Sequence, residues 1–354
     1  MPISRVDIKD FLVFKEELHV SFCPGVNVLI GANGTGKTTL LKAMYMACTV
    51  AKKRYKTALR ESESAVSEPR QSDDWHKMHE VISVTPYFPY FEYAQGVMTS
   101  MRICIETSSD QNEPAQVRYQ RDISTPDAKL TVYGFDPVGE VVYIPYTDVL
   151  SHSKGFLPLY YERDMPFDET YADVLSKAQL PVTRRVTPIA SAVIDILKSV
   201  IGGEVICEND VFFVKKEDNR LVPFTLEASG YRKLGLLWKL LRNGLLESGS
   251  MLFWDEPENS LNPELIPVLV DILLKLSQNG VQVFIATHSE LLSSYFAVNR
   301  LNANDVLFTS LYKDEEHICT NASNRFDLLE PNSLADEPVK LYKKELEKGL
   351  GGNG

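Results

Sequence analysis

Apolar and polar positions alternate near the start of the chain. Residues 4–9 and 18–22 have the period of two that β-strands show, and VNVLI at 26–30 is apolar throughout. A continuous apolar run is typical of a strand buried on both faces, as in a parallel sheet. The pattern changes to a helical one over about 38–58. The chain is therefore expected to open with strands followed by a helix.

The middle of the chain is less regular. Residues 60–75 are polar and charged, so we expect a mobile loop there. Short runs rich in Val, Tyr, Phe and Ile predict a β-subdomain over 80–146; they are EVISVTPYF, SMRICIET, AQVRYQRDI, KLTVYGF and EVVYIPY. Residues 147–221 are expected to form a helical lobe that ends in a hairpin, with helices over most of the span up to about 201.

The last third alternates between helices and strands. Strands are expected at 251–254 and 281–287, with a helical pattern before, between and after them. This order indicates an α/β core. A tail containing a helix is expected over 311–354. The chain shows neither a repeat of 20–50 residues nor sustained heptads.

Composition limits the class of protein. The 354 residues suffice for one large or two ordinary domains, and 44% apolar residues allow a proper core. With 37 basic and 48 acidic residues the net charge is −11, which argues against a surface built wholly for nucleic acid. The five cysteines are scattered without a C-x-x-C pair, as expected in a reducing cytosol.

The hydrophobic stretches do not indicate a membrane protein. The N-terminal MPISRVDIKDF lacks the apolar region of a signal peptide. The most apolar helical stretch, at 265–276, is short and is interrupted by Asp271 and Lys275. The sequence therefore predicts a cytoplasmic protein.

The first motif that carries chemistry follows the run at 26–30. GANGTGKTT at 31–39 fits G-x-x-x-x-G-K-[ST], with a buried strand before it and a helix after it. Such a loop surrounds phosphate oxygens with backbone N–H groups at a helix N-terminus. A chance glycine-rich turn is the alternative, which the flanking elements disfavour. The residues expected to bind ATP here are Asn33, Gly34, Thr35, Gly36, Lys37, Thr38 and Thr39. Lys37 would supply charge for the β- and γ-phosphates, and Thr38 would ligate Mg²⁺.

The second motif is SMLFWDEPENSLNP at 250–263. Its apolar strand ends in Asp255 and Glu256, at the edge where open α/β sheets bind ligands. Asp255 is expected to hold Mg²⁺, and Glu256 to activate water as general base. Acids that complement a helix N-terminus are the alternative. The presence of the phosphate loop favours the catalytic interpretation.

A third strand, in VQVFIATHSE at 281–290, ends in Thr287, His288 and Ser289. On its own, this pattern would indicate a capped helix start with a surface histidine. Because it ends the core strand that follows the acid pair, we expect His288 to contact the γ-phosphate.

The phosphate loop, the Asp-Glu pair, SLNP and ATHS occur in one order, which resembles the ABC-type ATPase superfamily. The N-terminal VDIKDFLVFKEELHVSFCPGVNVLIGANGTGKTTLLKAM is similar to the RecF/SMC/Rad50 and OLD-like branch, which includes the AAA-domain proteins of bacterial defence and toxin–antitoxin operons. The resemblance covers most of 1–50 and 222–300. It implies a P-loop NTPase head with an inserted antiparallel β-subdomain and a helical lobe, whose nucleotide-binding core is 1–58 and 222–310.

The resemblance also implies a head-to-tail dimer that encloses two ATP molecules. EASGYRK occupies the position of the signature helix, with Ser229 26 residues before Asp255. The N–H groups of Ser229 and Gly230 would then reach the partner subunit's γ-phosphate, whereas the alternative is an ordinary helix cap. The family pattern is Leu-Ser-Gly-Gly. If Gly230 is aligned with the second glycine, Ala228 stands in place of the serine. If the alignment is shifted by one so that Ser229 takes the serine position, Tyr231 stands in place of the second glycine. Ser260 to Pro263 match the D-loop, which crosses the dimer axis.

Other parts of the family pattern are weak or missing. Gln95, in FEYAQG, is the candidate for the glutamine that reaches the metal, and a turn residue is its alternative role. SMC and Rad50 proteins insert long coiled coils between phosphate loop and signature. Here 192 positions separate Lys37 from Ser229, so the resemblance implies a head without arms. The 65 residues after Ser289 are too few for an added nuclease domain of ordinary size.

The resemblance implies an ATPase that drives or gates a partner nuclease or toxin in bacterial or phage defence, or that acts in DNA repair. A transporter's nucleotide-binding subunit and a DNA-binding scaffold with weak hydrolysis are the alternatives. Two groups of basic residues are interpreted as solvated surface, with a DNA or partner contact as the alternative; they are Lys52, Lys53, Arg54, Lys56 and Arg60, and Arg184 with Arg185.

Overall fold

Three β-sheets organise the described part of the chain. The structure is a computed structural model that describes residues 2–61, 98–105, 115–122, 128–133, 139–163, 167–183 and 186–351. Its eight α-helices in these ranges are α1 (Lys37–Glu61), α4 (Phe156–Glu162), α5 (Glu169–Gln179), α6 (Pro188–Ile201), α7 (Ser229–Arg242), α8 (Ile266–Gln278), α9 (Glu290–Asn299) and α10 (Ser333–Gly351). The predicted 60–75 loop lies outside the described residues, apart from its first two at the end of α1.

The largest sheet, called the core sheet below, has the order β14–β13–β3–β12–β11–β7. Its strands are β3 (Val26–Gly31), β7 (Val141–Ile144), β11 (Met251–Asp255), β12 (Gln282–Ala286), β13 (Val306–Asp314) and β14 (His317–Ser323). All neighbouring pairs are parallel except β13 with β14. The expected α/β class is confirmed by this sheet.

A second sheet is antiparallel, in the order β2–β1–β4–β5–β6. It joins the chain's first two strands to the inserted β-subdomain; its strands are β1 (Ile3–Phe11), β2 (Phe14–Ser21), β4 (Met98–Ile105), β5 (Ala115–Asp122) and β6 (Ala128–Tyr133). A small third sheet, β10–β9–β8, consists of β8 (Glu204–Glu208), β9 (Val211–Lys215) and β10 (Leu221–Pro223). It supplies the hairpin expected at the end of the helical lobe.

Three predicted boundaries differ from the structure. β7 was assigned to the β-subdomain at 80–146, but it pairs in parallel with β11. β1 and β2, assigned to the nucleotide-binding core, belong to the antiparallel sheet, and β13 with β14 extend the core sheet into the predicted tail at 311–354. β7 lies at the edge of the core sheet but is buried along its whole length, as strands of a parallel sheet covered on both faces are, whereas β2 alternates between buried and exposed positions.

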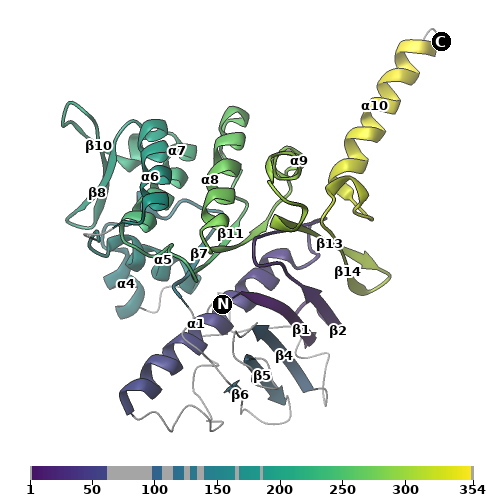
Figure 1. The fold of residues 1–354 in the computed structure, drawn as a ribbon, viewed down its shortest axis with the longest axis horizontal. Helices are drawn as coiled ribbons and strands as arrows, with labels where there is room; N and C mark the ends of the chain where they lie inside the picture. The colour runs from purple at the N-terminus through teal and green to yellow at the C-terminus, as the bar shows by residue number, and fades with distance from the viewer. Residues whose placement is uncertain are drawn as a thin grey trace.

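The two faces of the core sheet are covered differently. Alternate residues of β11 point to opposite sides, so that Leu252 and Trp254 join one cluster of buried residues while Met251 and Phe253 join the other. The first cluster includes α6, α7, α8 and α9, and the second includes α1 with β1 and β2. Figure 1 shows α6–α8 on one side of the molecule and α1 with β1 and β4 on the other.

Candidate nucleotide site

The phosphate loop connects β3 to α1, and glycine is required at both of its ends. Gly31 has φ +147°, and a Cβ there would lie 2.1 Å from the carbonyl oxygen of Leu311. Gly36 has φ +89°, and its Cβ would lie 2.7 Å from side-chain atoms of Val13 and Phe14. These are conformations and approaches that a larger residue cannot adopt without strain. The loop is thus fitted between β13 and the β1–β2 turn.

Lys37 lies folded over this loop. Its Nζ donates to the carbonyl oxygens of Gly31, at 2.7 Å, and Ala32, at 3.0 Å. The residue is only 6% exposed, and burial lowers the pKa of its ammonium to about 8, although Asp255 and Glu256 oppose this shift. The ammonium is therefore held beside the loop and needs anionic groups to offset its burial.

Thr38 and Asp255 come together from distant parts of the chain. The Thr38 hydroxyl donates to the two carboxylate oxygens of Asp255, at 3.0 and 3.1 Å. Asp255 ends β11 and is 3% exposed. Burial raises the pKa of its carboxyl to about 6, Glu256 adds to this shift, and the Thr38 hydrogen bond opposes it.

This pair fits a hard divalent cation. A hydroxyl and a carboxylate are oxygen donors of the kind that Mg²⁺ prefers, and a buried carboxylate is stabilised by a nearby positive charge. No group of three or more His, Cys, Asp or Glu side chains with metal-binding spacing occurs among the described residues. That agrees with the usual way in which Mg²⁺ is held, by one or two protein oxygens together with phosphates and water.

Glu256 and His288 face each other beyond Asp255. Glu256 Oε1 lies 3.9 Å from His288 Nε2, and the two side chains are 37% and 36% exposed. Glu256 has φ +46°, a conformation unusual for this residue, and its N–H donates to the carbonyl oxygen of Ala286 at 2.9 Å. Partial burial, followed by the charge of Lys37, lowers the pKa of His288, while Glu256 raises it. Both side chains can therefore reach a ligand bound at this edge.

Two residues that the sequence analysis did not identify hold these loops in place. Glu258 accepts hydrogen bonds through Oε1 from the Thr287 hydroxyl at 2.5 Å and the His288 N–H at 3.2 Å. Lys233, in the first turns of α7, donates to the carbonyl oxygen of Glu256 at 2.9 Å. Burial raises the pKa of Glu258 and lowers that of Lys233 to about 8. Glu258 could have been suspected from its place after the acid pair, whereas no local signal marks Lys233.

The signature helix α7 begins at Ser229, so the Ser229 side chain does not cap it. The N-cap is Ala228, which makes no side-chain capping bond, and the first helical bond runs from the Arg232 N–H to the Ala228 carbonyl. A Cβ on Gly230 would lie 2.9 Å from the Ser260 carbonyl oxygen. The start of α7 therefore packs on the D-loop of its own chain, with first-turn N–H groups that lack helical acceptors.

The remaining predicted site residues have varied surroundings. Thr35 is buried, and its hydroxyl donates to the Ala32 carbonyl at 2.9 Å, whereas Asn33 and Gly34 are exposed at the loop's tip. Thr39 is half-buried in the first turn of α1.

Gln95, like Arg184 and Arg185, lies outside the described residues. The role predicted for Gln95 therefore stays a prediction.

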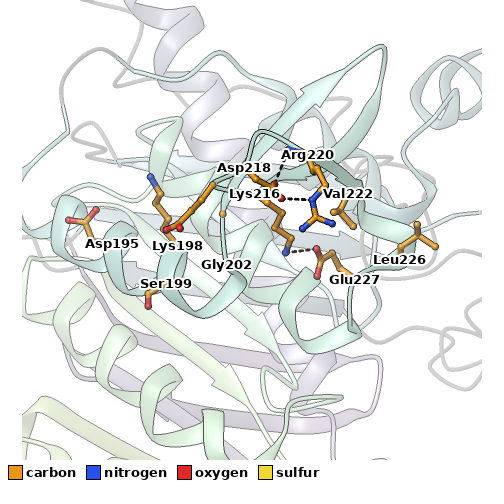
Figure 2. A pocket seen from close by; sticks show the side chains of 12 residues that line it. Asp195, Lys198, Ser199, Gly202, Lys216, Asp218, Arg220, Val222, Leu226 and Glu227 are labelled. Atoms are coloured by element: carbon orange, nitrogen blue, oxygen red, sulfur yellow. Dashed lines mark hydrogen bonds and ion pairs between the residues drawn. The ribbon is translucent and has the colours of Figure 1, made fainter.

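Two pockets lie in or beside the helical lobe. One of about 610 Å³ borders the start of α7 and the D-loop, with Tyr146, Phe156, Tyr171, Ser229 and Ser260 among its lining residues. The other, of about 820 Å³, lies between α6 and the β9–β10 turn (Figure 2). Each of its basic side chains is paired with an acid at 2.5–2.7 Å, so it shows no free charge for an anion; the pairs are Lys198 with Glu204, Lys216 with Glu227, and Arg220 with Asp218.

The parallel core sheet, the phosphate loop and the acid pair at one strand edge define the head of an ABC-type ATPase. Residues 26–294 match the family model described as "AAA domain, putative AbiEii toxin, Type IV TA system", and the chain belongs to this family. No helix in the described ranges is long and apolar enough to cross a membrane.

Sequence relatives and solved structures fall in the RecF/SMC group. The chain is 34% identical over 123 residues to the DNA replication and repair protein RecF of Limosilactobacillus fermentum. The aligned region covers 34% of this chain and 28% of that protein. It is 49% identical over 45 residues to RecF of Lactobacillus johnsonii, 13% of this chain and 12% of that protein. The matched part is thus under a third of the length of these relatives.

The fold is that of an SMC head, and the described residues contain no coiled-coil arm. An SMC head bound to the C-terminal winged-helix domain of ScpA superposes with a TM-score of 0.54 at 11% identity, over 91% of this chain and 97% of that one. An SMC head from Pyrococcus furiosus, with an extended coiled coil and bound to the C-terminal domain of ScpA, gives 0.52 at 10% identity, over 97% and 98%.

Proposed function

We propose that this protein binds and hydrolyses ATP with Mg²⁺, and that two copies enclose two ATP molecules to drive or gate a partner effector. The contact between Thr38 and Asp255 carries this proposal, because it joins the phosphate loop to the acid strand at one edge of the core sheet. Bound Mg²⁺ would there neutralise phosphate charge. Lys37 would bind the β- and γ-phosphates, and Asn33, Gly34, Gly36 and Thr39 would surround them with N–H groups.

Glu256 is the proposed general base and His288 the proposed γ-phosphate contact. Both side chains are about a third exposed and lie within 4 Å of each other, so that a water and a phosphate oxygen can reach them together. The lowered pKa of His288 keeps the imidazole neutral near pH 7. A neutral ring can accept a proton from water or donate its N–H to a phosphate oxygen.

The dimer is proposed from the start of α7. The first-turn N–H groups at Ser229 and Gly230 have no helical acceptor and would bind the γ-phosphate held by the partner subunit. The D-loop packs against this helix start within one chain, so movement of either would reach the other.

A nuclease or toxin is the proposed effector, in bacterial or phage defence. The family description names a Type IV toxin–antitoxin system, which supports a place in such a system. A role in DNA repair is the second candidate, and it is supported by the RecF relatives. In either case the head would use ATP to change its contacts with the effector.

Replacement of Glu256 tests the proposal. Glu256→Gln should bind ATP but release phosphate at least ~10²-fold more slowly, as expected when a general base is lost. The trapped ATP should also stabilise the dimer in sedimentation experiments. Glu247→Gln, at an exposed loop position, serves as the matched control. Unchanged turnover in Glu256→Gln would mean that Glu256 only begins the following turn and that the base lies elsewhere.

A further inference from the structure

The last described helix carries an apolar face exposed to solvent. Ala335, Val339, Tyr342 and Leu346, together called the α10 stripe, are spaced by four, three and four residues. That spacing places them on one side of a helix, as in the seam of a coiled coil. Val339, Tyr342 and Leu346 are 51%, 61% and 42% exposed.

Only the start of α10 is held by the body of the molecule. Leu334 packs against the buried cluster under the core sheet, and the Ala335 N–H donates to Asn332 Oδ1 at 3.3 Å. From Asp336 to Lys348 every residue is exposed. Figure 1 shows α10 leading away from the other elements toward the C-terminus.

A helix in this position needs a partner for stability. The exposed part of α10, from Asp336 to Lys348, is close to the length of about 12–15 residues below which isolated helices are marginal in water, because packing of an apolar face supplies most helical stability in proteins. Pro338 lies inside α10 and removes one main-chain bond, which weakens the helix further. A surface that covers the α10 stripe would offset both costs.

We propose that the α10 stripe pairs with the same stripe of a second copy, in an antiparallel arrangement that does not require nucleotide. In this arrangement Val339 of one copy packs against Tyr342 of the second copy, and Ala335 against Leu346. The contact is symmetric, so each interaction occurs twice.

The charged residues beside the stripe favour a second copy of this protein as the partner, and they favour antiparallel pairing of the two helices. Asp336 and Lys343 are seven residues apart on the same flank of the stripe, near its two ends. An antiparallel pair therefore places Asp336 of each copy beside Lys343 of the other, which gives two opposite-charge contacts. A parallel pair would instead place Lys343 beside Pro338 of the second copy, so neither opposite-charge contact would form.

This contact is separate from the proposed ATP-enclosing interface. Each subunit would then have two different two-fold interfaces. When both interfaces are engaged, such subunits assemble into closed tetramers or open filaments. ATP would therefore convert α10-linked dimers into larger assemblies.

Sedimentation velocity of the full chain without nucleotide tests the pairing. The parent protein should show a monomer–dimer equilibrium, unchanged in a Lys37→Ala background. Leu346→Glu should weaken the dimer by at least ~10-fold, because both contacts between residue 346 and Ala335 of the second copy are lost and a charged carboxylate is placed at each end of the seam. Leu341→Glu is the matched control: Leu341 is 59% exposed on the opposite face of α10, and its replacement should leave the dimer intact.

A charge exchange tests the direction. Asp336→Lys and Lys343→Asp should each weaken the dimer, and the double variant should restore it, since each ion pair is then re-formed in reverse. A monomeric parent at every concentration would overturn the proposal, as would equal weakening by Leu341→Glu and Leu346→Glu. Failure of the double variant to restore the dimer would overturn the antiparallel arrangement. None of these outcomes depends on ATP hydrolysis.

Discussion

The Thr38 hydroxyl lies 3.0 Å from a carboxylate oxygen of Asp255, although 217 positions separate the two residues. The contact forms because α1 begins and β11 ends at the same edge of the core sheet. It places a metal-binding hydroxyl beside a buried acid whose pKa is raised to about 6. In the protein without nucleotide, the negative charge of the ionised Asp255 carboxylate is therefore unfavourable, because the carboxylate is buried.

Asp255→Asn is expected to stabilise the nucleotide-free protein at neutral pH. The folded state holds the Asp255 proton more tightly than the unfolded chain, where the pKa is 3.8. The stability contribution of Asp255 therefore falls as pH rises from about 4 to about 6, by on the order of 2–3 kcal/mol. Urea unfolding at several pH values should show this fall in the parent protein but not in Asp255→Asn.

The same variant should lose its response to magnesium. The parent protein should bind ATP more tightly as Mg²⁺ is added, and chelation of Mg²⁺ should remove that gain, whereas Asp255→Asn should respond weakly to either. An equal magnesium response in parent and variant would remove Asp255 from the metal site.

Lys37→Ala is expected to abolish ATP binding, because the phosphates lose the loop's only side-chain charge. Calorimetric titration with ATP measures this loss. Lys275→Ala, on the surface of α8, is the matched control and should bind as the parent does. Equal affinity in Lys37→Ala and the parent would rule out the phosphate-loop assignment.

Glu258→Ala is expected to lower both stability and turnover. The Thr287 hydroxyl and the His288 N–H would lose their acceptor, at a cost of about 1–3 kcal/mol for the buried donor, and His288 would no longer be held toward Glu256. Thr187→Ala is the control for stability. It removes the side-chain cap of α6 and should lower the free energy of unfolding by about 1 kcal/mol without a comparable loss of turnover. Equal phosphate release by both variants would show that Glu258 only stabilises the fold.

The two-subunit site is best tested at Ser229. A side chain at Gly230 would displace the D-loop of its own chain, so Gly230→Glu cannot separate effects within a subunit from effects between subunits. Ser229→Glu places an acid at a helix N-terminus, where it is tolerated, yet it should repel the partner subunit's phosphate. ATP binding should be nearly unchanged, while hydrolysis should fall strongly.

Mixing subunits distinguishes the possible causes of that fall. A dimer of one Ser229→Glu and one Lys37→Ala subunit contains one intact phosphate loop opposite one intact signature helix. Partial ATPase activity should therefore return on mixing. Inactive mixtures in which mixed dimers are demonstrated would count against the head-to-tail arrangement.

The sequence by itself determined the local parts of this protein. The spacing of Gly31, Gly36 and Lys37 after an apolar run predicts the loop, since backbone conformation there depends on adjacent residues. The strand that ends in Asp255 is equally local, because four consecutive apolar residues indicate burial on both faces. The order of these motifs was enough to predict the α/β class and the family resemblance.

Only the tertiary structure decided which distant segments meet. β7 looks like the strands of the β-subdomain, yet it pairs with β11, because strand pairing depends on contacts across the chain that no local pattern encodes. The same holds for Lys233, whose ammonium reaches the Glu256 carbonyl, and for Gly230, whose missing side chain leaves room for the D-loop. Propensity and periodicity describe neighbours along the chain, whereas these contacts arise from packing, which sets the geometry of the site.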